Sequence, residues 1–201
     1  MQKLKKSSKQ NNKPKFNLVM FYGPFAVGKY TVANEFHKQT GYKFIHNHDT
    51  FNVARKLFER ETYELHNLYE KMNFVIFKGI ADARINIVTT HAYSADFISK
   101  TGLSDSAYIK KIEEIIRRKG GDAYFVHLTA TSKALLERVN SSSRKKLNKL
   151  VDPKVMKETI KEKEGTDSWT KSAPVENNIK IDNSNLSPKQ VVKIVRKEFN
   201  I

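Results

Sequence analysis

Residues 23–29 read GPFAVGK and fit the Walker A pattern G-x-x-x-x-G-K. A run of apolar residues precedes this segment and an amphipathic helical pattern follows it, which is the context that phosphate binding requires. Glycines let the backbone curl so that successive N–H groups point inward, and the helix N-terminus adds a partial positive charge. The pattern therefore predicts that Lys29 reaches the β- and γ-phosphates of a nucleotide. Four further residues would supply the cradle: Gly23, Ala26, Val27 and Gly28. The alternative, a glycine turn without function, would lack these flanks.

One position departs from the pattern. The residue after the lysine is normally Ser or Thr, whose hydroxyl binds Mg²⁺, but here it is Tyr30 and the hydroxyl comes at Thr31. Thr31 lies about 100° further round the helix, which favours contact with the α-phosphate over contact with the metal. Mg²⁺ would then be held through water or by another group. The candidates are Thr31, Asp49, Thr89 and Thr90.

Strand and helix patterns alternate along the chain, which predicts an α/β fold with five parallel strands and helices on both faces. The expected strands span residues 16–22, 42–45, 84–90, 123–129 and 178–182. The expected helices span residues 29–40, 49–60, 61–83, 105–119 and 132–139, one that begins near residue 153, and 188–199. Asp49 or Thr50 would cap the second helix, Ser104 and Asp105 the fourth, and Ser132 the fifth. A basic insertion between the fourth and fifth strands would form a helical lid.

Ligands of open parallel sheets bind beyond the carboxyl ends of the strands. That rule selects His46, Asn47, His48 and Asp49 after the second strand, and Thr90, His91 and Tyr93 after the third. Asp49 is a candidate base or orienting group for an acceptor hydroxyl, and Arg55 a candidate clamp for an anionic acceptor. The alternative for Asp49 is helix capping.

Three histidines could instead have other roles. His46 and His48 share one face of an extended chain, so they contact substrate or serve the structure through both ring nitrogens. Together with His91 they could hold zinc, but the sequence identifies no fourth ligand.

Residues 23–31 (GPFAVGKYT), the basic lid and the final strand with its Ser-Pro-capped helix resemble the shikimate/adenylate/gluconate-kinase branch of the P-loop proteins. The chain is more closely similar to small P-loop ATPases with a GPPAVGK-like loop and an HNH segment, here residues 46–48. The resemblance runs from residue 16 to 201, with Phe25 in place of the second proline. It implies a P-loop NTPase three-layer sandwich with a helical lid, and the cofactors ATP and Mg²⁺.

The resemblance also implies roles at the nucleotide base and in the lid. Arg138 would stack on the adenine ring, Arg144 would reach the transferring phosphate, and Asn183 would form the other wall of the base site. Guanidinium groups stack on planar rings and chelate phosphate oxygens. The alternative for Arg144 is a solvated basic helix end.

Lys and Arg outnumber Asp and Glu by 37 to 21, which gives a net charge of +16. Six of these lysines lie in residues 1–15, which we expect to form a disordered basic arm before a single domain at 16–201, with the lid at about 140–175. A field of this sign attracts anions. The chain has no cysteine, and no apolar run long enough to span a bilayer. We expect a cytoplasmic protein without membrane contact.

The predicted function is ATP-dependent phosphate transfer to a small molecule. One alternative is a nucleotide-binding module with little turnover, which Tyr30 and the lack of an acidic residue at the end of the third strand favour. A nucleic-acid kinase acting through the basic arm is less favoured, because no recognition motif is present. The guanine-reading Asn-Lys-x-Asp segment is absent from the sequence, which favours ATP over GTP.

Overall fold

A computed structural model describes residues 15–140 and 152–201. Arg144 and the neighbouring lysines of the predicted lid lie outside the described residues. Five strands form one parallel sheet in the order β2-β3-β1-β4-β5. The strands are β1 (Asn17–Gly23), β2 (Lys43–Ile45), β3 (Ile87–Ala92), β4 (Asp122–Thr129) and β5 (Asn178–Asp182). The predicted five-stranded parallel sheet is confirmed.

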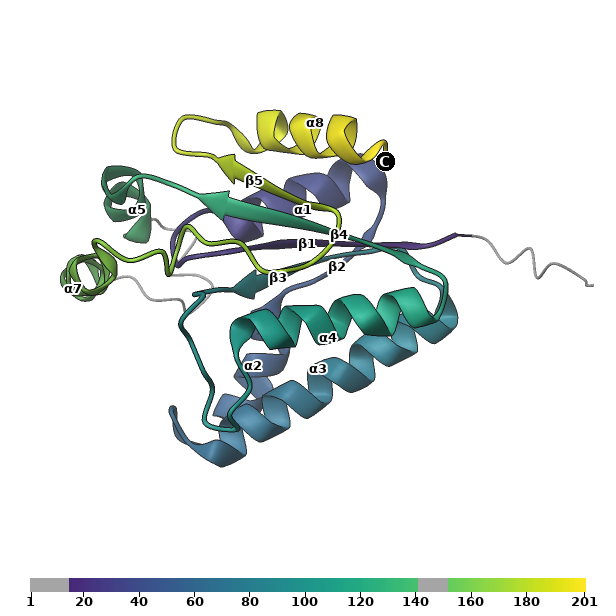
Figure 1. Cartoon of the computed structure of the whole chain (residues 1–201), viewed down its shortest axis with the longest axis horizontal. Coiled ribbons are helices and arrows are strands. Elements are labelled where there is room, and N and C mark those ends of the chain that lie inside the picture. The colour runs from purple at the N-terminus through teal and green to yellow at the C-terminus, as the bar shows by residue number, and fades with distance from the viewer. Residues whose placement is uncertain (1–14, 141–151) are drawn as a thin grey trace, which may run out of the picture.

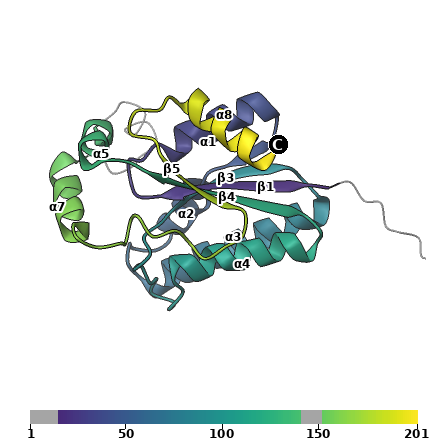
Figure 2. The same cartoon turned by 45° about the horizontal axis from the view of Figure 1, so that its top comes forward.

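Helices cover both faces of the sheet, so the molecule has three layers (Figure 1). One face carries α1 (Lys29–Thr40) and α8 (Pro188–Phe199), and the other carries α3 (Tyr63–Ala83) and α4 (Asp105–Arg118). Beyond the arrowheads of the strands lie α5 (Ser132–Val139) and α7 (Pro153–Lys163), and Figure 2 shows the same placement from a second angle. The short helix α2 (Asn47–Arg55) follows β2.

Side chains of the central strand alternate between two cores. Val19 and Phe21 of β1 belong to the core under α1 and α8, whereas Leu18, Met20 and Tyr22 belong to the core under α3 and α4. All five are almost completely buried. A strand covered on both faces must be apolar at every position, which is why β1 reads as a continuous apolar run.

Two helix starts differ from the sequence prediction. The cap of α2 is His46, not Asp49 or Thr50, because the ring nitrogen of His46 accepts a hydrogen bond from the His48 N–H. The cap of α5 is Thr131, not Ser132, because the Thr131 hydroxyl accepts from Ala134 N. In both cases a residue earlier in the chain, with extended backbone, satisfies the first helical donors.

The third strand also begins later than residue 84. Arg84 ends α3 in the left-handed conformation, with φ 55°. The strand then pairs with β1 as far as the pair Gly23 and Ala92, beyond the predicted end at residue 90. The predicted end of α2, near residue 60, is also wrong, because this helix stops at Arg55.

The chain changes direction in the sheet between β1 and β3. These strands are neighbours, yet the helix after β1 lies on one face and α4, which follows β3, lies on the other (Figure 1). Such a switch point opens a crevice at the carboxyl ends of the two strands. None of the described helices is both long enough and apolar enough to cross a membrane.

Candidate nucleotide and acceptor site

The N-terminus of α1 has no capping side chain. Its cap residue is Gly28, at φ 101°, with no side-chain hydrogen bond. Every other described helix has a capping side chain that accepts from a backbone N–H of its first turn: His46, Thr62, Ser104, Thr131, Asp152 and Ser187. Because Gly28 follows the predicted phosphate loop, the N–H groups that a cap would occupy are placed for an anion.

Lys29 folds back over this loop. Its ammonium group donates hydrogen bonds to the carbonyl oxygens of Gly23 (2.8 Å) and Pro24 (2.6 Å). The lysine is half-buried at the first position of α1. A positive charge therefore lies at the mouth of the loop, beside the uncapped helix end.

Gly23 accepts no side chain. Its φ is 139°, and a Cβ at this position would collide with the backbone carbonyl of Leu128 in β4. Only glycine lets the end of β1 pass this close to β4 and turn into the loop. The first glycine of the motif thus has a packing role as well as the predicted phosphate role.

Arg138 of α5 holds the far side of the loop. It donates to the Val27 carbonyl (3.4 Å) and the Asn183 side chain (3.1 Å), and to the carbonyls of Asn183 and Ser184 (both 2.9 Å). Asn183 is buried and donates to the Val27 carbonyl at 2.8 Å. The two predicted base-site residues are thus brought together beside the loop, and their contact with adenine stays a prediction.

Replacing Arg138 by Lys is expected to raise the KM for the predicted nucleotide, ATP, about 10-fold or more, because several hydrogen bonds from a charged donor are lost. A lysine cannot present donors in the planar fork that reaches these four acceptors. Steady-state kinetics with varied ATP would measure the change. The matched control is Arg118→Lys in the exposed part of α4. An unchanged KM in Arg138→Lys would contradict a bracing role.

Tyr30 occupies the position where the motif normally has a metal-binding hydroxyl. Its ring packs against the rings of His46 (centroids 5.0 Å apart) and Phe44 (5.4 Å). The residue therefore joins the start of α1 to β2 and to the head of α2. Thr31 is exposed on α1, and its role toward a phosphate or a metal stays a prediction.

The residues after β2 form a tight helix cap. The His46 N–H donates to the Asp49 carboxylate at 2.8 Å, while the His46 ring accepts from the His48 N–H at 2.9 Å. Asp49 thus takes part in capping, the alternative foreseen for it. The Thr90 hydroxyl at the end of β3 donates to the Asn47 side chain at 3.2 Å. This hydrogen bond joins the end of β3 to the head of α2, and ligand binding at these strand ends stays a prediction.

His91 at the end of β3 is paired with a residue that the sequence suggested only as a helix cap. Its Nε2 lies 3.0 Å from one oxygen of Asp105, and the other oxygen accepts from the Ser94 N–H at 2.9 Å. The His91 ring also stacks on Tyr108, with centroids 4.5 Å apart. Both partners are buried. Arg55 lies at the opposite end of α2, and no described hydrogen bond or ion pair joins it to this group.

A second buried histidine, His127 of β4, lies beneath the loop. Its ring stacks on Tyr22 with centroids 4.7 Å apart, and its Nδ1 lies 2.9 Å from the Ser172 hydroxyl. Burial is the main cause that lowers the pKa of His127 to about 4, and the positive charges of Lys180 and Lys29 lower it further. This imidazole is therefore neutral at pH 7. The sequence carried one signal for the burial of His127. This residue follows Phe125 by two positions in a predicted strand, and alternate residues of a strand share a face.

A pH titration should reveal the buried His127. Its folded pKa of about 4 lies below the unfolded value of 6.5, so the unfolded chain binds the extra proton. The free energy of unfolding should fall by about 3 kcal/mol as the pH drops from 6.5 to 4. Urea unfolding at several pH values would measure this. His127→Gln should flatten the profile in that window relative to His37→Gln, and equal profiles would contradict the assignment.

No protein-family model and no curated protein matches the sequence. The structure does resemble solved structures across nearly the whole chain. The chain has the P-loop kinase fold. A sugar kinase from Janibacter sp. HTCC2649 is 15% identical, with 94% of this chain and 96% of that chain covered and a TM-score of 0.61.

Two further structures share the P-loop kinase fold. A shikimate kinase from Bacteroides thetaiotaomicron is 12% identical, with 92% and 99% of the two chains covered and a TM-score of 0.59. A gluconokinase from Sinorhizobium meliloti is 15% identical, with 93% and 92% covered and a TM-score of 0.55. At such identities the likeness concerns the fold. It confirms the three-layer P-loop fold that the sequence resemblance implied.

Metal binding was tested against the described side chains. Within residues 15–140 and 152–201, no group of three or more His, Cys, Asp or Glu side chains could hold a metal ion, so the zinc alternative gains no support. Mg²⁺ needs fewer protein ligands, because in phosphate-transfer sites it is bound by one or two protein oxygens, the phosphates and water. Thr31 and Asp49 remain the predicted candidates.

The chain between α7 and β5 runs back along the sheet (Figure 1), and the end of α7 and the residues just after it contact the loop that follows β3. Lys163 donates to Asp96 at 2.6 Å, and the Ser168 carbonyl accepts from Ala95 N at 2.7 Å. Burial would raise the pKa of Asp96, but hydrogen bonds from Lys163 and Ser94 hold it at about 2. The loop after β3 is therefore tied to the end of α7.

Proposed function

We propose that this protein is an ATP-dependent phosphotransferase whose acceptor is a hydroxyl-bearing small molecule. One observation carries the proposal: the uncapped N-terminus of α1 and the charge of Lys29 lie at the carboxyl end of β1, beside β3. Ligands of open α/β sheets bind at such a switch point. The fold shared with a sugar kinase, a gluconokinase and a shikimate kinase supports the same reading.

Phosphate transfer needs positioning and charge neutralisation more than a covalent nucleophile. In the proposed reaction the N–H groups of the loop and of α1 hold the phosphates. Lys29 exchanges the Gly23 and Pro24 carbonyls for the β- and γ-phosphate oxygens. Arg138 and Asn183 keep the loop against the end of β5, and Arg144 would add charge from the lid. Mg²⁺ would neutralise part of the phosphate charge when bound.

The acceptor would lie on the side of β2 and β3. His46, His48 and His91 line the ends of these strands, and Asp49 sits at the head of α2. In the proposal Asp49 orients the acceptor hydroxyl or takes its proton, while the Asp105 contact fixes the orientation of the buried His91 ring at the end of β3. Arg55 would bind an anionic group of the acceptor.

The direct test is transfer of labelled γ-phosphate from ATP and Mg²⁺ into a panel of hydroxyl acceptors: sugars, sugar acids, cyclic polyols and nucleosides. The expected result is one phosphorylated class, with no product when EDTA is present. Mass spectrometry of the product identifies the acceptor class. Tight ATP binding with no product from any acceptor would contradict the proposal.

A second candidate is a nucleotide-binding module with little turnover. The packing of Tyr30 against His46 and Phe44 favours it, because the usual metal-binding hydroxyl is replaced by a ring that joins two elements. Such a module would bind ATP with an affinity that hardly changes when Mg²⁺ is removed. Calorimetric titration of ATP with and without Mg²⁺ separates the two candidates.

A further inference from the structure

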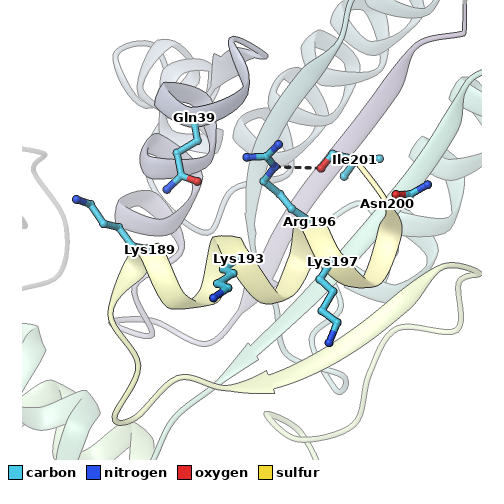
Figure 3. A pocket seen from close by; sticks show the side chains of 7 residues that line it. All are labelled: Gln39, Lys189, Lys193, Arg196, Lys197, Asn200 and Ile201. Carbon is cyan, nitrogen blue, oxygen red and sulfur yellow. Dashed lines mark hydrogen bonds between the residues drawn. The ribbon is translucent and has the colours of Figure 1, made fainter.

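The outer face of α8 carries a row of positive charges away from the strand ends. Figure 3 shows the shallow hollow that these side chains line along the helix, next to Gln39 of α1. The hollow is lined by Gln39, Lys189, Lys193, Arg196, Lys197, Asn200 and Ile201. We call the four cations among them, Lys189, Lys193, Arg196 and Lys197, the α8 stripe. No acidic residue lines the hollow.

The amphipathic pattern of α8 puts the stripe on the surface. Val191, Val192 and Val195 are fully buried against the sheet. The stripe residues are exposed on the opposite side, within an arc of about 100°. Lys189, Lys193 and Lys197 recur every four residues, so they form a line about 12 Å long. The Arg196 Nε donates to the Ile201 carbonyl at 3.0 Å, which fixes that guanidinium beside the line (Figure 3).

The charges of the stripe are not offset by acidic side chains. None of the ion pairs found among the described residues includes a stripe residue. The contrast is α4, where Lys110 and Arg117 both pair with Glu113. Opposite charges three or four residues apart stabilise a surface helix, and no described ion pair of this kind involves the stripe. Among the described residues, the three lysines of the stripe are therefore exposed and form no ion pair with an acidic side chain.

The shape of the hollow favours a repeating anion over a single small one. It is open, and long lysine side chains lose conformational freedom when one small ion must order them. A polymer with regularly spaced charges engages all of them at once. Duplex nucleic acid carries about one negative charge per 1.7 Å of its axis, so a line of 12 Å meets several phosphates.

We propose that the α8 stripe binds the phosphate backbone of nucleic acid, without reading its bases. The surface lies over α8 and α1, so it is separate from the proposed phosphotransfer site and goes beyond that function. Backbone binding by lysines releases counterions and depends steeply on salt. The stripe would hold the protein on a duplex while the strand ends of the sheet stay accessible.

The test compares two triple variants of the full chain. In the first, Lys189, Lys193 and Lys197 are replaced by Gln; in the second, Lys71, Lys78 and Lys100, which are exposed elsewhere, are replaced by Gln. Both lose the same formal charge, and both keep the N-terminal lysines. Fluorescence anisotropy with two 20-base-pair DNA duplexes of unrelated sequence gives the binding constant at several salt concentrations.

We expect the stripe variant to lose about 3 units from the slope of log K against log salt, because each phosphate contact contributes about 0.9. The control variant should keep the wild-type slope, and the two duplexes should bind equally. Equal losses in both variants, or no loss in the stripe variant, would overturn the proposal. Tighter binding of polyglutamate than of either duplex would also overturn it. ATP affinity should be the same in all three proteins, which separates this result from the fate of the phosphotransfer proposal.

Discussion

Lys29→Ala is expected to lower the rate of phosphate transfer from ATP at least about 10²- to 10³-fold, the range seen when one group that stabilises developing charge is removed. The lysine carries the only charge that the described structure places directly against the loop carbonyls of Gly23 and Pro24. Its loss leaves the backbone N–H groups in place, so ATP binding should weaken less than turnover. Single-turnover transfer with saturating ATP measures the chemical step.

The control for this result is Lys38→Ala, on the exposed side of the same helix α1. It removes one positive charge from α1 without touching the loop, and its transfer rate should match the wild type. Circular dichroism and the unfolding midpoint of both variants would show that α1 is intact. Transfer by Lys29→Ala at more than a tenth of the wild-type rate would mean that the loop does not act as proposed.

Gly23→Ala is expected to be the most destabilising single substitution in the loop. The left-handed backbone alone costs about 1–2 kcal/mol for a residue with a side chain. The new Cβ would also meet the Leu128 carbonyl, a backbone group that cannot move without disturbing β4. We expect the free energy of unfolding to fall by more than about 3 kcal/mol, beyond the usual effect of a point substitution. Urea unfolding monitored by circular dichroism would measure it.

Gly41→Ala separates the two causes. Gly41 ends α1 with φ 73°, but a Cβ there would have nothing within 4 Å. This variant should show the backbone cost alone, about 1–2 kcal/mol. If both variants lose equal stability, the close approach of Gly23 to β4 is not the cause.

The sequence predicted the fold and the loop of residues 23–29 because both rest on short-range patterns. Residues 23–29 adopt their loop between the strand and helix that flank them in sequence, and α1 begins and ends where its pattern predicted. The parallel sheet follows from the alternation of strands and helices. Buried parallel strands must be apolar on both faces, which makes them visible in a sequence.

The partners of the polar residues could not be predicted, because they depend on distant segments. Asp105 looked like a helix cap, yet the fold places its carboxylate 3.0 Å from His91. His127 looked like one residue of an apolar strand, and its partner Ser172 lies 45 positions away. Asp49 was open between capping and catalysis, and only the structure shows that it accepts from the His46 N–H.

The segment after α7 has a mechanical consequence. Lys163 and Ser168 tie it to the loop that follows β3, and Ser172 and Ala173 tie it to His127 and Tyr22 at the centre of the sheet. Because the segment is held by hydrogen bonds at both ends, α7 cannot move without straining one set of these contacts. Any outward movement of α7 must either break the Asp96 contact or pull residues 94–97 along with it. Opening on the proposed nucleotide side would therefore be coupled to movement on the proposed acceptor side.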